Sequence, residues 1–279
     1  MEFKLTPFKG LVILLVGLVL CSWCQAAQHN LTVDNGVISV TLDTDDATLL
    51  VTDKRTGKTW RQKPITKGKI IQSIATGNGI EMTWRHIDLE MDIKTRLLLD
   101  ENLPEFRLDL SAEGKYKWGL KFPHPFVTES GTYLVVPMNE GISYPVEDKT
   151  ISPRRLITYG GHGICMPFWG VTDGRQGYMA IFETPDDAAI RIQRTDEKLC
   201  ISPEWDSQKG RFGYTRRLRY VFFDKGGHVA ICKRYRSYAQ KAGLLKTLEQ
   251  KRKENPDVDL LIAGDGEEEG QGFHGRWDA

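Results

Sequence analysis

The sequence predicts a mainly β protein, with an antiparallel β body from about residue 28 to 225, then a helix and the first part of an α/β barrel. Two observations support this expectation. Short segments in which apolar and polar residues alternate recur between Leu31 and Phe223, as is typical of antiparallel sheets with one solvated face. From Gly226 onward, the apolar residues instead follow the period of a helix.

The β body contains segments of regular alternation separated by turn sequences. The alternating segments are residues 38–42, 80–84, 86–94, 106–110, 118–122 and 218–222. Asn, Asp and Gly gather between predicted strands and favour turns there, at residues 34–36, 53–57, 77–79 and 173–174. Many strands at this spacing indicate a sandwich or a barrel, and a body of about 200 residues can bury one core without help from a metal or a disulfide.

The C-terminal part has the pattern of a helix followed by a strand. Apolar residues share one face of a helix predicted from about residue 227 to 253: Ile231, Tyr235, Tyr238 and Ala242. Asn255-Pro256 ends this helix, and residues 258–262 have the composition of a buried strand. Because a (β/α)₈ barrel needs roughly 200 residues or more, we expect 226–262 to be the linker helix and first strand of a truncated barrel. Residues 263–279, rich in Gly and Glu, are expected to form a disordered tail.

The N-terminal residues 1–27 are predicted to be a signal peptide. Lys4 and Lys9 precede an uninterrupted apolar run from residue 11 to 20, and the small residues Ala26 and Ala27 follow it. The run is short for a transmembrane helix, although an uncleaved membrane anchor remains an alternative. The sequence therefore predicts a secreted or periplasmic protein with no membrane contact beyond this segment.

Composition excludes several classes of partner and site. The chain has 38 Lys and Arg against 37 Asp and Glu, so no basic surface for nucleic acid is expected. Beyond the leader, Cys165, Cys200 and Cys232 are widely spaced, which is incompatible with a disulfide scaffold or a zinc motif. At most one disulfide can form, and small buried side chains are the simpler interpretation. No metal or cofactor is expected.

Two polar segments could contact a carbohydrate. In the first, Asn139 and Glu140 lie between Pro137 and Pro145, and Tyr144 follows, so the segment reads as a rigid exposed loop facing a sugar or another domain. An ordinary rigid loop is the alternative.

The second segment, residues 159–171, places glycines around His162 and ends with Phe168-Trp169. An aromatic ring beside polar loops can stack on the apolar face of a sugar. The alternative is that Phe168 and Trp169 begin a core strand. The carbohydrate-contact candidates are thus Asn139, Glu140, Tyr144, His162 and Trp169.

An enzymatic alternative uses the same region. His124 or His162, paired with Glu140 or Glu183, could act as general acid and base in a free-standing sugar epimerase or lyase. The carboxylate pair of a glycosidase cannot be located, because nothing in the sequence fixes two carboxylates at the required separation.

The sequence also resembles known domains. Residues 33–36 and 51–60 resemble the first hairpin of galactose-mutarotase-like supersandwich domains that precede glycosidase barrels. Residues 136–145, 166–173 and 233–246 resemble the endo-α-N-acetylgalactosaminidases and related α-N-acetylgalactosaminidase-like glycoside hydrolases. The resemblance spans about residues 30 to 262, and the order of the motifs carries it.

This resemblance implies an antiparallel β-supersandwich that acts as an accessory, carbohydrate-associated domain of a secreted glycoside hydrolase. In such families the catalytic carboxylates lie in the barrel that follows, so no catalytic residue is carried over and the domain is expected to be inactive alone. A secreted structural or interaction module without sugar affinity is a further alternative.

Overall fold

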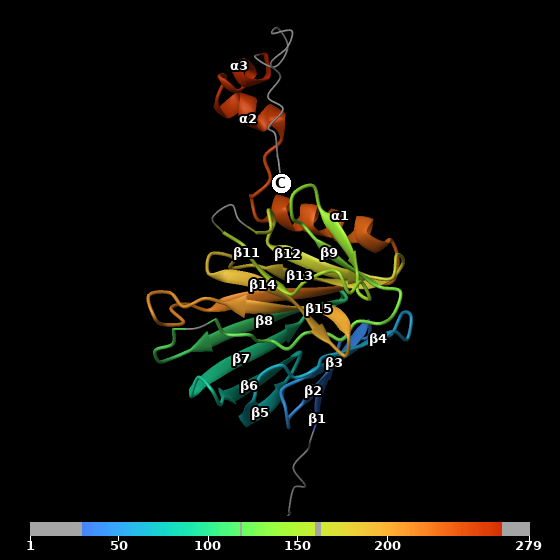
Figure 1. The fold of residues 1–279 in the computed structure, drawn as a ribbon, viewed down its shortest axis with the longest axis vertical. Coiled ribbons are helices and arrows are strands. Elements are labelled where there is room, and N and C mark those ends of the chain that lie inside the picture. The colour runs from blue at the N-terminus through green and yellow to red at the C-terminus, as the bar shows by residue number, and fades with distance from the viewer. Residues whose placement is uncertain (1–29, 118, 160–162, 264–279) are drawn as a thin grey trace, which may run out of the picture.

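The structure is a computed structural model that describes residues 30–117, 119–159 and 163–263, which form sixteen strands and three helices (Figure 1). The strands are β1 Asn30–Asp34, β2 Ile38–Asp43, β3 Leu49–Asp53, β4 Thr59–Arg61, β5 Gly68–Thr76, β6 Gly79–His86, β7 Met91–Leu99, β8 Glu105–Ala112, β9 Tyr133–Val136, β10 Ile142–Pro145, β11 Arg154–Ile157, β12 Phe168–Thr172, β13 Gly177–Phe182, β14 Ala188–Thr195, β15 Lys198–Trp205 and β16 Arg216–Phe223. The helices are α1 Gly227–Lys241, α2 Leu248–Glu254 and α3 Val258–Ala263.

The strands form three antiparallel sheets. The largest has nine strands in the order β10-β9-β12-β13-β16-β8-β7-β6-β5, and the others are β1-β2-β3-β4 and β11-β14-β15. A bulge shifts the register between Ile70 and Gln72 on the edge strand β5. The predicted mainly β, antiparallel sandwich is therefore confirmed.

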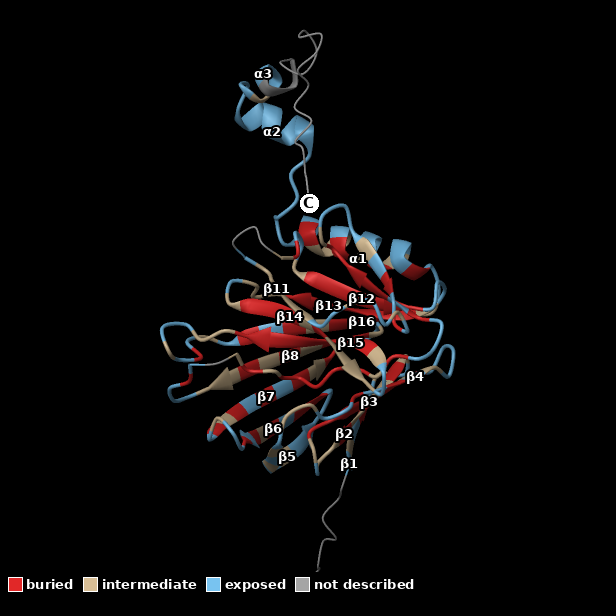
Figure 2. Ribbon diagram, in the orientation of Figure 1, coloured by how far each residue is buried: buried red, intermediate tan, exposed pale blue. Residues whose placement is uncertain are grey.

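Both small sheets cover the same, inner face of the nine-stranded sheet. One continuous core joins inward residues of all three sheets, such as Val40 of β2, Ile190 of β14 and Leu108 of β8. Its largest fully buried side chains include Trp84, Trp169 and Trp205. Strands with one buried face give the alternation seen in the sequence, as in β7, whereas β12 and β13 are buried along their whole length (Figure 2).

Helix α1 covers part of the outer face of the nine-stranded sheet. Its residues Ile231, Tyr235 and Ala239 pack on apolar side chains of β9, β12, β13 and β16. Tyr235 stacks on Phe168 with ring centres 4.5 Å apart. The helix lies so close to the sheet that a Cβ on Gly170 would stand 2.7 Å from Ile231 Cδ1.

An ion pair also fixes α1 to the sheet. Glu105 of β8 is 3% exposed, and its two carboxylate oxygens accept hydrogen bonds from Arg234 of α1 at 2.7 and 2.6 Å. Arg219 of β16 lies 3.4 Å from the same carboxylate and 2.6 Å from Glu183. A carboxylate this deeply buried needs such partners, because an unpaired charge in this position is strongly unfavourable.

Two predicted strands differ from the structure. Residues 86–94 are not one strand, because residues 87–90 form the turn between β6 and β7, where Glu90 has a φ of 49° and Ile87 is 50% exposed. In the predicted strand 118–122, Trp118 lies outside the described residues. Leu120 forms only an isolated bridge to Trp205.

The C-terminal prediction is also corrected. The helix predicted over 227–253 is interrupted after Lys241: Gly243 has a φ of 71°, and Thr247 caps a separate helix, α2. Residues 258–262, predicted to be a barrel strand, belong to helix α3. A lone strand would leave its peptide groups unpaired, whereas a helix satisfies them locally. The predicted signal peptide and tail lie outside the described residues, and within the described part no helix is long and apolar enough to cross a membrane.

His124 is part of the core and is bonded as a neutral ring. It lies edge-on to Trp84 and Phe122, with ring centres 5.8 and 5.6 Å away. Its Nδ1 accepts from the Ile65 N–H at 3.4 Å, and its Nε2 lies 3.2 Å from the Asp46 carbonyl, to which it donates when the proton sits on Nε2. Burial lowers the pKa of His124 to about 4.

We predict that replacing Arg234 with Ala lowers the free energy of unfolding by about 3 kcal/mol, because Glu105 keeps its burial but loses its bidentate partner. Urea unfolding followed by tryptophan fluorescence measures the change. The matched control is Arg236→Ala on the exposed side of the same helix, expected to stay within about 0.5 kcal/mol of wild type. Equal losses in the two variants would contradict the role given to the ion pair.

We also predict an acid-sensitive step caused by His124. Its pKa is lower in the folded than in the unfolded chain, so the unfolded chain binds the proton more tightly and stability falls as pH drops from about 6.5 towards 4. The loss amounts to about 3 kcal/mol. Urea titrations at several pH values should show a smaller decrease for His124→Gln than for wild type, and an unchanged slope would exclude this source.

Candidate functional site

A groove of about 550 Å³ lies on the outer face of the nine-stranded sheet, between α1 and the β9–β10 hairpin. The sheet provides its floor, including Val135 of β9 and Phe168 of β12. The hairpin and α1 contribute polar and aromatic groups: Tyr133, Asn139, Glu140 and Ser143 from the hairpin, and His228 and Cys232 from α1. We call this the hairpin groove. Figure 1 shows α1 and β9 lying beside each other at this end of the molecule.

The loop between β9 and β10 holds its shape through backbone geometry and hydrogen bonds. Asn139 and Gly141 adopt left-handed φ values of 51° and 95°. The Gly141 N–H donates to the Met138 carbonyl at 2.9 Å. Cys165 fixes the loop from outside, since its N–H and its Sγ lie 2.8 and 3.0 Å from the Pro137 carbonyl. Asn139 and Glu140 are exposed on this loop, as the sequence predicted.

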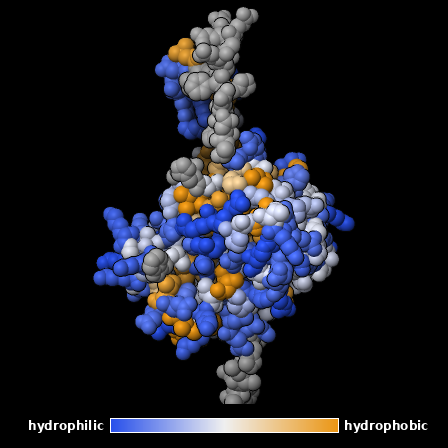
Figure 3. Space-filling model, viewed as in Figure 1, coloured by the Kyte–Doolittle hydropathy of each residue, from blue (hydrophilic) through white to orange (hydrophobic). Residues whose placement is uncertain are grey.

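The hairpin groove combines an exposed aromatic ring with hydrogen-bonding groups. Tyr133 is 41% exposed, and Asn139 and Glu140 are exposed beside it. A ring can stack on the apolar face of a sugar while an amide and a carboxylate bond its hydroxyls. Figure 3 shows a largely hydrophilic face with scattered apolar patches, and the hairpin groove combines apolar floor residues with polar residues.

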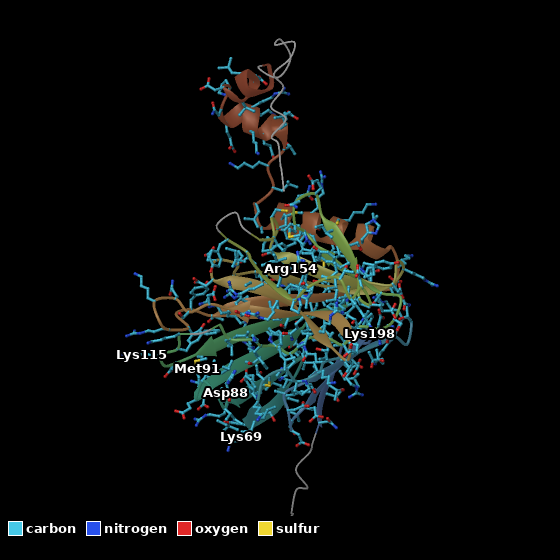
Figure 4. All side chains as sticks on the ribbon, in the orientation of Figure 1. Lys69, Asp88, Met91, Lys115, Arg154 and Lys198 are labelled. Atoms are coloured by element: carbon cyan, nitrogen blue, oxygen red, sulfur yellow. The ribbon has the colours of Figure 1, made fainter. Side chains whose placement is uncertain are left out.

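Of the four candidate contact residues that the structure describes, two line this groove, namely Asn139 and Glu140. Tyr144 is 8% exposed and belongs to the inner core; the guanidinium carbon of Arg154, labelled in Figure 4, lies 5.9 Å from its ring centre. His162 lies outside the described residues.

Trp169 requires a correction. It is 1% exposed and packs between Phe182 and Tyr220, so its ring is a core side chain and presents no face to a ligand. The alternative weighed from the sequence, a core strand beginning at Phe168, describes it correctly.

Sequence reasoning missed Tyr133, His228 and Cys232. Tyr133 begins β9, in which the next three residues are all buried, so no alternation marked its outward direction. The positions of His228 and Cys232 in the groove depend on how α1 packs on the sheet, which is not a local property of the sequence.

The two glutamates of the enzymatic alternative lie in different surroundings, since Glu140 lines the groove while Glu183 is paired with Arg219.

His124 cannot serve as the general acid or base of that alternative in this conformation. Both ring nitrogens are occupied by backbone groups, and its lowered pKa keeps it neutral. Of the three cysteines, Cys200 is buried as expected, whereas Cys165 and Cys232 are exposed, and all three are free thiols. Within the described residues, no cluster of three or more His, Cys, Asp or Glu side chains could hold a metal.

Comparison with known proteins identifies the fold. No protein-family model matches the chain, and no curated protein matches it in sequence. The structure is similar to α-N-acetylgalactosaminidase NagBb from Bifidobacterium bifidum in its GalNAc complex, with a TM-score of 0.70 and 18% identity over 83% of this chain and 42% of that one. For the Gal-NHAc-DNJ complex of the same enzyme, the TM-score is 0.68 and the identity 17%, over 81% of this chain and 41% of that one.

The chain thus spans about two fifths of the length of these solved structures. At this level of identity the likeness concerns the fold, which agrees with the supersandwich resemblance drawn from the motifs. The molecule thus has an antiparallel β-sandwich fold like that of the part of NagBb that it matches.

Proposed function

We propose that this chain is an accessory, carbohydrate-associated domain of a secreted glycoside hydrolase, inactive as a glycosidase by itself. The observation that carries the proposal is the match to NagBb, which takes in 83% of this chain but only 42% of the enzyme. The larger part of that enzyme has no counterpart here. Secretion rests on the leader predicted at residues 1–27.

The hairpin groove supplies the carbohydrate contact in this proposal. It is open, has room for a monosaccharide and presents Tyr133 beside Asn139 and Glu140. Because the NagBb structure contains GalNAc, we take N-acetylgalactosamine as the first sugar to test.

The segment after α1, from residue 242 to 263, which we call the C-terminal arm, favours contact with a further domain. Helices α2 and α3 project away from the sandwich (Figure 1), and α2 has no buried residue. Leu244, Leu248 and Leu260 are 65%, 46% and 71% exposed. Exposed leucines gathered on one short segment are typical of a surface that another domain covers, so we assign this arm to the contact with the barrel.

We predict that N-acetylgalactosamine binds the isolated domain weakly and that Tyr133→Ala weakens this binding about tenfold, because stacking on an aromatic ring contributes roughly 1.4 kcal/mol. NMR titration of the labelled protein measures the affinity. Tyr159→Ala, another exposed tyrosine that lies outside the groove, is the control and should bind like wild type. An unchanged affinity of Tyr133→Ala would exclude the groove, and no binding of any simple sugar would favour a purely structural module.

We further predict that trypsin first cleaves the arm at Lys246, Lys251 or Lys253, all exposed, while the β body remains intact. A loosely packed segment opens at little cost, whereas cleavage of the body requires unfolding of the core. Mass spectrometry of the early fragments identifies the sites. First cuts inside residues 30–223 would contradict a detached arm.

A further inference from the structure

A second hollow, of about 400 Å³, lies on the outer face of the nine-stranded sheet over β5 to β8. It is separate from the hairpin groove, since the two share no lining residue, and α1 packs on the sheet over β12, β13 and β16 rather than over this part. Strand pairing determines which side chains line this hollow, because directly opposed residues in neighbouring antiparallel strands point to the same face of the sheet.

One row of opposed residues crosses four strands and is continued by the residue that precedes β16. Gln72 of β5 pairs with Thr83 of β6, which pairs with Lys94 of β7, which pairs with Ser111 of β8. Because Arg216, the first residue of β16, pairs with Leu110, Thr215 just before it lies near Ser111. All members of this row, which we call the polar row, line the hollow: Gln72, Thr83, Lys94, Ser111 and Thr215.

The polar row offers unused hydrogen-bonding groups. No side chain among the described residues bonds the hydroxyls of Thr83, Ser111 and Thr215 or the amide of Gln72. Each of these four groups can both donate and accept a hydrogen bond. They flank a single ammonium, that of Lys94, on both sides.

The charges on either side of the polar row are already paired. In one neighbouring row, Arg96 lies 3.4 Å from Glu81, and Asp109 accepts from Arg107 at 2.8 and 3.0 Å. On the other side, Arg85 pairs with Asp92.

Lys94 is the most weakly paired of these cations, because even the exposed Arg96–Glu81 pair is closer, at 3.4 Å. Its partner Glu113 is 3.8 Å away, and the two side chains are 67% and 95% exposed. An exposed pair at this distance contributes little, so the Lys94 charge is available to a ligand.

We propose that the polar row binds a sugar that carries a sulfate or carboxylate group. The anionic group lies against the Lys94 ammonium, and the ring hydroxyls bond Thr83, Ser111 and their neighbours. Glu81 and Asp109 at the margin are engaged with Arg96 and Arg107, so the Lys94 ammonium is the charge that orients the anionic group. That the ligand is a sugar rests on the proposed carbohydrate association. The site itself and its charge preference follow from the strand register.

The test compares four probes by NMR titration or calorimetry: N-acetylgalactosamine, N-acetylgalactosamine 6-sulfate, inorganic sulfate and, as the carboxylate-bearing sugar, glucuronate. We expect the sulfated sugar to bind about tenfold more tightly than the neutral one and than sulfate alone. Lys94→Gln should remove this preference. The matched control Lys69→Gln, an exposed lysine on β5 outside the hollow and labelled in Figure 4, should keep it.

A second variant tests the sugar contacts. Thr83→Val with Ser111→Ala should weaken binding of the sulfated sugar but leave the weaker binding of sulfate unchanged. Equal affinity for neutral and sulfated sugar, or a preference that survives Lys94→Gln, would overturn the proposal. Sulfate binding as tightly as the sulfated sugar would overturn its carbohydrate part. Loss of groove binding in Tyr133→Ala, measured with the neutral sugar, reports separately on the proposed function.

Discussion

The register of the nine-stranded sheet determines which of its side chains point to the inner face and which to the outer face. The rest of the molecule depends on this division. Inward residues meet the two small sheets in one continuous core. Outward residues lie under α1, in the hairpin groove or in the polar row. A shift of register by one residue would exchange the two sets. The division explains why Tyr144 and Trp169 are core residues while Tyr133 and Lys94 are open to ligands.

The parts of the fold that could be predicted from the sequence are the strands that have one buried face and one solvent-exposed face. Segments such as 106–110 show their direction in the sequence, because the polar residues Arg107 and Asp109 mark the outward positions. In β12 both faces are buried, by the core on one side and by α1 on the other, so Trp169 carried no signal of its direction. The turn at residues 87–90 was missed because Ile87 and Leu89 continue the apolar alternation through it.

The remaining errors concern packing between distant segments. Residues 258–262 are apolar enough for a strand, but strand structure needs neighbouring strands, and none of the described residues provides them. Only part of the candidate groove could be predicted, because the rest depends on packing between distant segments. A local loop pattern marks Asn139 and Glu140. His228 instead reaches the site through the packing of α1, which depends on the buried pair Glu105–Arg234.

The two edges of the nine-stranded sheet bear on how the protein behaves at high concentration. An open edge can recruit the edge of another molecule and so seed polymerisation. On β5, Ile71 and Ile74 are half exposed, but the bulge between Ile70 and Gln72 interrupts the regular spacing that an incoming strand would need. At the opposite edge, β10 has only four residues and ends in Pro145, which has no N–H to offer. Irregularity at both margins thus disfavours edge-to-edge pairing between copies of this sheet.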